Sequence, residues 1–438
     1  MIKKTTKIHG NVHLTGSKPT LQAPVPPYIY LATANTRCPK IDIYVKPGDH
    51  VNMGQVIGMR QAAFFTQPVH STVSGTYEGL EKHYHRSGKC VDFLKIKNDF
   101  KDTMDSSIVE RTDEQVKALS HDEMTEIIKN CACVGLGGSS FPTYIKFQTK
   151  NKIKTILIDG IECEPYVSAD KKIMIERTDL VLKGIEYLLW AFDCHDARIC
   201  FKKKHSDLIH VFQNALGNPE YKDFNITVCT VKDFYPQGWE IAMIKSALGI
   251  DVPSGHLPSE FGVFNVNVST VWGIYLALKF NMPVFERMVT INGEGVNAPA
   301  NFNVRIGSPL KPLIDKCGGY KNPEIPKKII LGGPMMGASI TTDDCILTKT
   351  VTSIIILDYH QIDATSCVRC GSCILSCPVG LQPVTIMKTM QSMPVDKAKI
   401  KALNPMKCIG CGLCSYSCTS NINVKEFVER AKIIQRLP

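Results

Sequence analysis

The sequence contains no long apolar run. Within its 438 residues, no stretch reaches the about 18 consecutive apolar residues that a membrane-spanning helix needs. The N-terminal segment MIKKTTKIHGNVHLTG is basic but has no apolar core, so it does not resemble a secretory signal. These two absences predict a protein that is cytosolic, or that at most lies against a membrane.

The sequence also lacks a block of like charge. It has 51 Lys and Arg against 41 Asp and Glu, and the resulting net charge of +10 is spread through short segments such as FKKKHS and IPKK. No nucleic-acid-binding motif accompanies this excess. A mild positive charge suits an anionic cofactor, an acidic protein partner or an anionic membrane surface, and does not distinguish among them.

Cysteine, in contrast, is abundant, with 18 residues of which eight fall in two tight groups near the C-terminus. Without a secretory signal, a disulfide framework is not expected. Clustered thiols in a reducing compartment indicate a bound metal. Ten cysteines lie outside the groups: Cys38, Cys90, Cys131, Cys133, Cys163, Cys194, Cys200, Cys229, Cys317 and Cys345.

The chain is long enough for several domains, and its pattern predicts four. Residues 1–105 read as short β segments in which IDIYVKPGDHVNMGQVIGM and QPVHSTVSGTYEGL resemble the two halves of a barrel-sandwich, lipoyl-like module. A carrier of that fold presents a Lys at the tip of its connecting hairpin, but the tip RQAAFFTQ has none. We therefore expect a structural module rather than a carrier.

The remaining three parts predict a multidomain α/β protein. In residues 106–285 apolar strands such as KTILI alternate with helices such as TDLVLKGIEYLLWAF, which indicates a Rossmann-like domain with a mainly parallel sheet. Residues 286–360 return to β character, suggest a β-grasp-like domain and include the glycine-rich loop LGGPMMGASI. Residues 361–438 hold the two cysteine groups, joined by helical segments, and end in a basic helix.

The two cysteine groups share one spacing, with two residues between successive cysteines and three before the fourth. Four thiolates also suit zinc, but two such groups of four are typical of a ferredoxin with two 4Fe-4S clusters. In two-cluster ferredoxins the fourth Cys ligates the other cluster. Carried over, Cys367, Cys370, Cys373 and Cys418 hold one cluster, and Cys408, Cys411, Cys414 and Cys377 hold the other.

Small differences separate the two groups. Gly371 and Gly412 occupy matching places, where a small residue lets backbone amides reach the cluster sulfurs. Pro378 follows the first group, whereas Thr419 follows the second. We treat Thr419 as a tolerated departure, because the proline orients a turn and does not ligate.

Two loops in the predicted α/β domain could bind a nucleotide. The segment GLGGSSFPTYIKF packs glycines before a helix, whose free amides suit a phosphate, but it has neither a Walker lysine ending nor GxGxxG, so a structural turn remains an alternative. The acidic segment DGIECEPY follows a strand, where its carboxylates could hydrogen-bond ribityl or ribose hydroxyls. A polar loop that caps the next helix is the alternative.

Taken together, these segments resemble the RnfC family, the C subunits of the Rnf electron-transport complex, and more distantly the NADH-oxidising flavoprotein subunit of respiratory complex I. The similarity also includes VKPGDHVNMGQVIG, YPQGWE, VPSGHLP, GEGVNAPANFNVRIG, LGGPMMG and CVRCGSCILSCPVGLQP, in order from about residue 9 to the end. It implies FMN held by the glycine-rich loop and NAD(H) stacked on the flavin. The implied cofactor-binding residues are Gly135, Gly137, Gly138, Lys146, Asp159, Glu162, Glu164, Gly238, Glu240, Asn267 and Thr270.

The chain departs from the family at a few positions. Trp239 stands where a glycine is usual, and we expect it to pack rather than to stack on a ring. Ser139 and Ser140 replace a more usual Ala-Gly in the glycine-rich loop. The region 286–350 shows no ligand chemistry, so we assign it a scaffolding role. We expect Cys163 to be a packing residue, since neighbouring carboxylates raise the pKa of a thiol.

The resemblance implies a peripheral subunit of a ferredoxin:NAD oxidoreductase complex on the cytoplasmic side of the bacterial membrane. It would exchange hydride between NAD(H) and FMN and pass single electrons through the clusters to or from other subunits, with ferredoxin as the ultimate partner. Coupled Na⁺ or H⁺ transport would belong to membrane subunits, and the basic C-terminal helix could dock there. Alternatives are a soluble cobalamin reductase of the propanediol-utilisation type and a non-flavin electron carrier.

Overall fold

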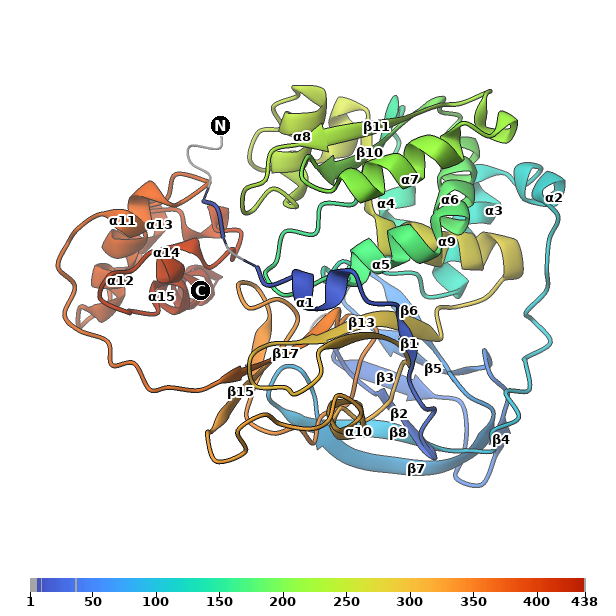
Figure 1. Ribbon diagram of the computed structural model, residues 1–438, viewed down its shortest axis with the longest axis horizontal. Coiled ribbons are helices and arrows are strands. Elements are labelled where there is room, and N and C mark those ends of the chain that lie inside the picture. The colour runs from blue at the N-terminus through green and yellow to red at the C-terminus, as the bar shows by residue number, and fades with distance from the viewer. Residues whose placement is uncertain (1–5, 9, 36–37, 437–438) are drawn as a thin grey trace.

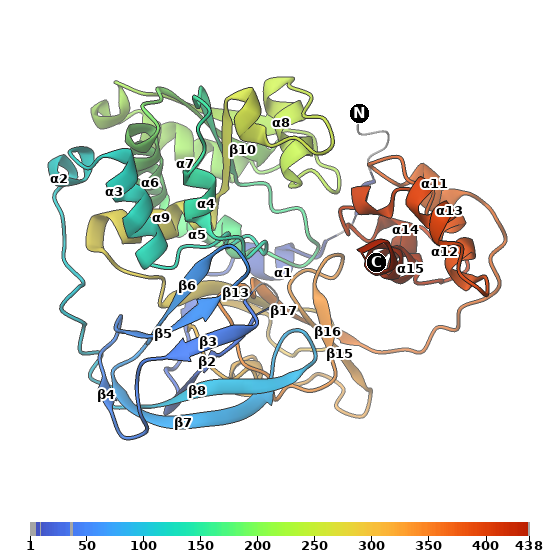
Figure 2. The same ribbon diagram turned by 180° about the vertical axis from the view of Figure 1, so that it is seen from behind.

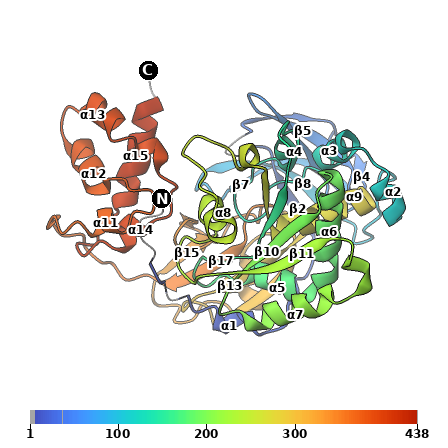
Figure 3. The ribbon, with the colours of Figure 1, turned by 90° about the horizontal axis from the view of Figure 1, so that it is seen from above.

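The computed structural model describes residues 6–8, 10–35 and 38–436. Figure 1 shows a large body built from two β-rich regions and a helical layer, with a smaller helical domain at its side. Figure 3 shows the same separation from above. An extended segment, residues 359–371, joins this small domain to the last strand of the body.

The N-terminal module consists of two antiparallel sheets. One has the order β2(Tyr28–Ala32), β8(Cys90–Asn98), β7(Gly75–Tyr84) and β4(His50–Val51), and the other the order β3(Lys40–Ile43), β5(Val56–Gln61) and β6(Thr66–His70). Alternating residues such as Ile29, Ile57 and Leu94 fill the core between them. At the tip of the β5–β6 hairpin, Phe65 is buried in the core of the neighbouring α/β domain. The hairpin therefore docks one module against the next (Figure 2).

The α/β domain is built on a four-stranded sheet that is parallel throughout. Its order is β11(Asn225–Val231), β10(Asp196–Lys202), β9(Thr155–Asp159) and β12(Val263–Asn267). The helices are α2(Asp113–Lys117), α3(His121–Asn130), α4(Thr143–Phe147), α5(Ala169–Glu176), α6(Thr178–Ala191), α7(Ser206–Leu216), α8(Glu240–Leu248) and α9(Val268–Phe280), with 3₁₀ turns at Pro219–Tyr221 and Pro258–Phe261.

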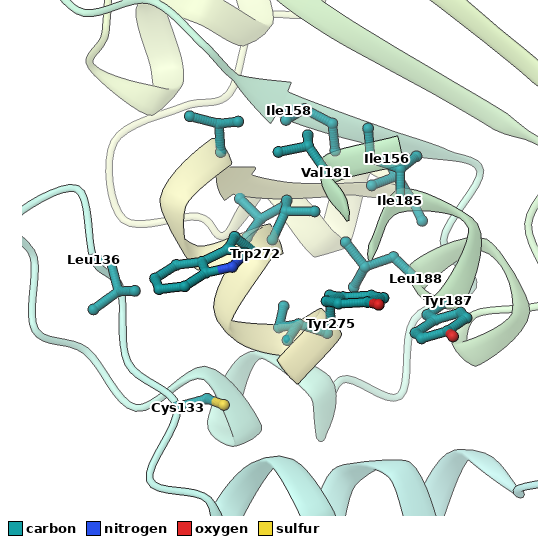
Figure 4. Packing of buried hydrophobic residues seen from close by; sticks show 14 of the residues in the cluster. Cys133, Leu136, Ile156, Ile158, Val181, Ile185, Tyr187, Leu188, Trp272 and Tyr275 are labelled. Atoms are coloured by element: carbon teal, nitrogen blue, oxygen red, sulfur yellow. The ribbon is translucent and has the colours of Figure 1, made fainter. Parts of the chain in front are cut away.

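Both faces of this sheet are covered. Ile156 and Ile158 of β9 face α6 and α9, as Figure 4 shows, whereas Leu157 between them packs with residues of α8 on the other side. Such two-sided burial explains why the strand is continuously apolar. Leu136, from the glycine-rich loop, is buried in the same core as Trp272 of α9. The core therefore anchors one end of this loop.

The third region is a six-stranded mixed sheet. Its order is β1(Leu21–Gln22), β14(Ala300–Arg305), β13(Glu286–Asn292), β17(Ser353–Asp358), β15(Lys327–Leu331) and β16(Ala338–Ile340), with α10(Lys311–Lys316) beside it. The N-terminal β1 pairs in parallel with β14, and α1(His13–Gly16) precedes it. The N-terminal segment thus crosses from the first predicted module to the third, a pairing that local sequence patterns do not reveal.

The small domain contains α11(Ser372–Leu375), α12(Pro383–Gln391), α13(Lys397–Ala402), α14(Leu413–Tyr416) and α15(Val424–Arg436), with a 3₁₀ turn at Pro405–Lys407. Its core includes Ile386, Ile400 and Val428. Gly371 and Gly412 immediately precede α11 and α14, and both have φ of +77°, which glycine adopts without strain. In the part of the chain that the structure describes, no helix is long and apolar enough to cross a membrane.

Candidate functional site

A cavity of about 670 Å³ lies where the four regions meet. It is lined by Arg86 of the N-terminal module, by the carboxyl ends of β9 and β12, by the segment Gly332–Gly337 of the six-stranded sheet, and by Ile409 of the small domain. Its size suits a cofactor-sized ligand. All eleven cofactor-binding residues predicted from the sequence line it: Gly135, Gly137, Gly138, Lys146, Asp159, Glu162, Glu164, Gly238, Glu240, Asn267 and Thr270.

The glycine-rich loop presents its backbone to the cavity. The Leu136 amide donates to Thr270 Oγ1 at 2.9 Å, which fixes the loop to the start of α9. A Cβ on Gly137 would lie 2.9 Å from Asn267 Cγ, whereas one on Gly138, with φ of +110°, would point into open space. Among the described residues, the amides of Gly137 and Gly138 have no protein acceptor. This loop can therefore approach a ligand closely and donate to it.

Four half-buried acidic residues line the same cavity: Asp159, Glu162, Glu164 and Asp170. Burial raises the pKa of Asp159 to about 7 and that of Glu164 to about 7. Burial and the charge of Asp170 raise the pKa of Glu162. The sequence interpretation missed Asp170, although it lies in the same stretch as the acidic segment; it accepts from Asn267 Nδ2 at 2.8 Å and also from Ser269 Oγ.

Glu164 gives a direct test of whether a hydroxyl-bearing cofactor fits. Its Oε2 accepts from the Met335 amide at 3.0 Å, but its buried Oε1 has no hydrogen-bond partner in the structure. A buried oxygen without a donor is costly. A ribityl or ribose hydroxyl would supply one, so the donors and acceptors present fit FMN.

Lys146 also lines this cavity. Its Nζ donates to the Asn265 carbonyl at 3.2 Å and lies 3.8 Å from Glu240 Oε2. Burial lowers the pKa of Lys146. Trp239 also lines the cavity and is only partly buried, so its indole is available to a ligand as well as to its packing neighbours.

The six-stranded sheet does more than the scaffolding role that we assigned to it. Gly332, Gly333 and Met336, from the loop between β15 and β16, line the cavity. The adjacent Met335 contacts Glu164 through its amide. The glycine-rich motif LGGPMMG indicates a loop that could bind a ligand. Because it lies far from the acidic loop along the chain, its contact with that loop could not be predicted from the sequence.

The eight clustered cysteines form two sets. Cys367, Cys370, Cys373 and Cys418 line one small cavity. In the other set, burial raises the pKa of Cys411 to about 11 and of Cys414 to about 12, and the nearby charge of Cys377 contributes to both shifts. The fourth cysteine of each group thus lies with the first three of the other.

Backbone amides donate to cysteine sulfurs in both sets. The Ile422 amide lies 3.4 Å from Cys418 Sγ, the Gly410 amide 3.4 Å from Cys408 Sγ, and the Leu381 amide 3.3 Å from Cys377 Sγ. Within the described residues, no three His, Cys, Asp or Glu side chains are grouped as ligands of a single metal ion. A cubane cluster, with thiolates at four separate corners, needs a wider cage than one ion.

The two sets differ in position. Tyr235 Oη donates to the Cys411 carbonyl at 2.9 Å, and Ile409 lines the large cavity, so the Cys408–Cys414 segment faces the flavin-sized site. Cys370 is exposed on the other set. Hydrogen bonds from Ser372 and Thr419 lower its pKa to about 7, which gives Thr419 a role that the sequence interpretation missed.

The cysteines near the glycine-rich and acidic loops are poor nucleophiles. Burial raises the pKa of Cys133 to about 12 and of Cys163 to about 12. For Cys163 the sequence interpretation named the neighbouring carboxylates as the cause, but burial is the larger effect and the charge of Glu164 the second. A packing role agrees with these shifts.

The fold and the site together define a flavin- and iron–sulfur-containing oxidoreductase subunit. Family comparisons match a Nuo51 FMN-binding domain at residues 128–276 and a 4Fe-4S dicluster domain at 359–427. A RnfC barrel sandwich hybrid domain matches residues 2–101, and an SLBB domain matches 288–339. FMN and two 4Fe-4S clusters are therefore the cofactors of this chain.

Relatives that match over most of the chain identify the family. The C subunit of the Na⁺-translocating ferredoxin:NAD⁺ oxidoreductase complex of Acetobacterium woodii is 33% identical over 360 residues, 81% of this chain and 79% of the relative. The C subunit of the proton-translocating complex of Clostridium ljungdahlii is 32% identical over 375 residues, 84% and 80% of the two chains. The chain belongs to the RnfC family.

A more distant likeness concerns the fold alone. A chain of the NAD⁺-reducing [NiFe]-hydrogenase in its H₂-reduced state superposes with a TM-score of 0.51 at 13% identity. The match covers 72% of this chain and 63% of that one.

Proposed function

We propose that this protein exchanges hydride between NAD(H) and FMN and passes single electrons through its two clusters to or from other subunits of a ferredoxin:NAD oxidoreductase complex. We place it peripherally on the cytoplasmic side of the cell membrane. The relatives are named as Na⁺- or proton-translocating complexes, and we assign ion coupling to other subunits. Family membership favours this function over that of a soluble cobalamin reductase.

The residues of the large cavity have separate tasks in this proposal. The amides of Gly137 and Gly138, with Lys146 near them in sequence, would hold phosphate groups. Asp159, Glu162 and Glu164 would accept from ribityl or ribose hydroxyls. When bound, FMN supplies the exchange between two-electron hydride transfer and one-electron transfer.

The observation that carries the proposal is the contact between this cavity and one cysteine set. Ile409 lines the cavity, and Tyr235 holds the Cys411 backbone at 2.9 Å. Cys370 of the other set is exposed. We call the set that contains Cys408, Cys411 and Cys414 the inner set, and the set that contains Cys370 the outer set. This arrangement supports electron transfer from the cavity to the inner set, then to the outer set, and then to a partner at the surface.

Anaerobic purification followed by flavin, iron and sulfide analysis tests the proposal. We expect about one FMN and about eight irons per chain, and bleaching of flavin and cluster absorbance when NADH is added. In Cys370→Ser, NADH should still reduce the flavin and the inner set, while electron delivery to an external acceptor falls. In Cys411→Ser, only flavin absorbance should bleach.

Two results would contradict this assignment. Irons without flavin, and no bleaching by NADH, would support the non-flavin electron carrier instead. Undiminished reduction of the outer set in Cys411→Ser, with the inner cluster absent, would refute the proposed order of the clusters.

A further inference from the structure

A second cavity, of about 520 Å³, lies on another side of the glycine-rich loop. Its walls come from the β5–β6 hairpin of the N-terminal module, from the loop residues 138–140, and from residues 347–350 before β17. It shares Arg86, Gly138, Ser139 and Thr350 with the large cavity, so the two cavities adjoin. Nothing in the proposed function assigns it a ligand.

Among the residues that the structure describes, this cavity is lined by cations and by no carboxylate. Arg60, Arg86 and Lys349 line it together with His70 and His85, and its described lining contains neither Asp nor Glu. In contrast, the acid-lined large cavity next to it contains Asp159, Glu162, Glu164, Asp170 and Glu240. The charge difference between adjoining cavities indicates that they take different chemical groups.

The three cations have only neutral protein partners among the described residues. Arg60 Nε donates to the Ala32 carbonyl at 3.0 Å, Arg86 Nη1 to Thr350 Oγ1 at 2.9 Å, and Lys349 Nζ to the Ala132 carbonyl at 3.2 Å. Two other arginines in the same body are buried: Arg305 lies 2.7 Å from Asp102, whereas Arg287 donates to backbone carbonyls and has no ion pair among the described residues. Carbonyl contacts use few of the donors that a guanidinium or an ammonium offers.

Holding these groups together without a counter-charge is costly. Burial is the largest cause that lowers the pKa of Lys349 to about 8, and the charge of Arg60 lowers it further. Burial lowers the pKa of Arg60 to about 10. If the three side chains served only to join modules, neutral side chains would make the same carbonyl contacts without this cost.

We propose that this second cavity binds the phosphate group of a phosphorylated small molecule, held by Arg60, Arg86 and Lys349. One guanidinium group can donate to two phosphate oxygens at once, and three cations suit an anion that carries several negative charges. The cavity volume admits a molecule of nucleotide size. Two sources share this chemistry: a dinucleotide that reaches across the shared wall, which rests on the proposed function, and a separate phosphorylated metabolite.

Calorimetric titration of the flavin-loaded protein with inorganic pyrophosphate tests the site. We expect measurable binding that weakens at least tenfold in Arg60→Gln and in Lys349→Gln. Lys349→Arg, which keeps the charge, should retain most of the affinity. Lys150→Gln, which removes an exposed lysine of the α/β domain, is the matched control and should bind as the wild type does. Flavin content shows whether each variant is folded.

A competition experiment separates the two sources. If the site holds the phosphates of a dinucleotide, pyrophosphate should compete with NADH, and Lys349→Gln should raise the KM for NADH more than tenfold. If it holds a separate metabolite, pyrophosphate and NADH should bind together. Absence of pyrophosphate binding to the wild type, or equal affinity in Lys349→Gln and the wild type, would overturn the proposal, whether or not NADH reduces the flavin.

Discussion

Gly412 of the small domain packs closely against Met335 of the six-stranded sheet region, and we expect this contact to need a glycine. Gly371 provides a matched comparison. Both glycines precede a short helix of a cysteine group with φ of +77°. A Cβ at position 371 would meet no atom within 4 Å, whereas one at position 412 would lie 2.8 Å from the Met335 carbonyl oxygen. Alanine at the two positions therefore imposes the same backbone strain but only one steric clash.

The magnitudes follow from these contacts. A left-handed alanine costs about 1–2 kcal/mol at either position. The clash at position 412 adds about 1–3 kcal/mol, as overpacking does. Met335 cannot retreat easily, because its amide donates to Glu164 Oε2 at 3.0 Å and its carbonyl accepts from Lys425 Nζ at 3.0 Å.

Anaerobic denaturant unfolding, followed by cluster absorbance, measures the difference. We expect Gly412→Ala to lose about 1–3 kcal/mol more stability than Gly371→Ala. In stopped-flow experiments with NADH, cluster reduction should lag behind flavin reduction only in Gly412→Ala. Equal stability losses and equal cluster-reduction rates in the two variants would refute the conclusion that the contact between Met335 and Gly412 holds the small domain against the body.

Two further predictions concern charge. Because burial raises the native pKa of Asp159 to about 7 while the unfolded value stays near 4, the protonated carboxyl stabilises the flavin-free protein at low pH, and this contribution is lost as pH rises toward 7. The stability of Asp159→Asn relative to the wild type should therefore rise by about 2–4 kcal/mol between pH 4 and 8, and Asp223→Asn, at an exposed position, is the control for the loss of a carboxylate. The basic residues of the C-terminal helix, Lys425, Arg430 and Lys432, were expected to dock to membrane subunits, but they contact Met335, Glu426 and Glu429 of this chain. We therefore expect the exposed lysines of α13, Lys397, Lys399 and Lys401, to dock there instead. Their reversal to Glu should release the protein from membrane fractions, and unchanged co-sedimentation would contradict it.

Most residues of the candidate site belong to short sequence motifs. The glycine-rich loop, the acidic loop and YPQGWE lie in a domain of alternating strands and helices, and the carboxyl ends of parallel strands meet at one edge of a sheet. The resemblance to the RnfC family assigned residues as distant along the chain as Gly135 and Asn267 to one site, and both line the same cavity. The repeated cysteine spacing also predicts that the two groups form the same turn, and Gly371 and Gly412 indeed adopt the same backbone conformation.

What the sequence did not reveal depends on contacts between distant segments. The pairing of β1 with β14 leaves no trace in either strand's own pattern. Arg60, Arg86 and Lys349 stand in ordinary local contexts, and only the packing of three modules brings them to one cavity. The role of Thr419 beside Cys370 was missed for the same reason, because the hydroxyl acts on the other cysteine group.

The tertiary context also makes two locally similar cysteine groups unequal, and this leads to a prediction of their order of reduction. Cys370 of the outer set is exposed and receives hydrogen bonds from Ser372 and Thr419, which stabilise negative charge. Cys377 and Cys411 of the inner set are buried, so their surroundings stabilise negative charge less than those of Cys370 do. Both sets also receive backbone N–H bonds to sulfur, so the difference between them lies in solvent exposure, which raises the reduction potential of a cluster.

The outer cluster should therefore be reduced at the higher potential, so that an electron entering from the cavity moves toward the surface. Redox titration followed by electron paramagnetic resonance would show this order. Thr419→Val removes one hydroxyl from Cys370 and should lower the potential of the outer cluster alone. If the inner cluster of the wild type were reduced at the higher potential, the difference in solvent exposure between the two sets would not determine the direction of electron flow.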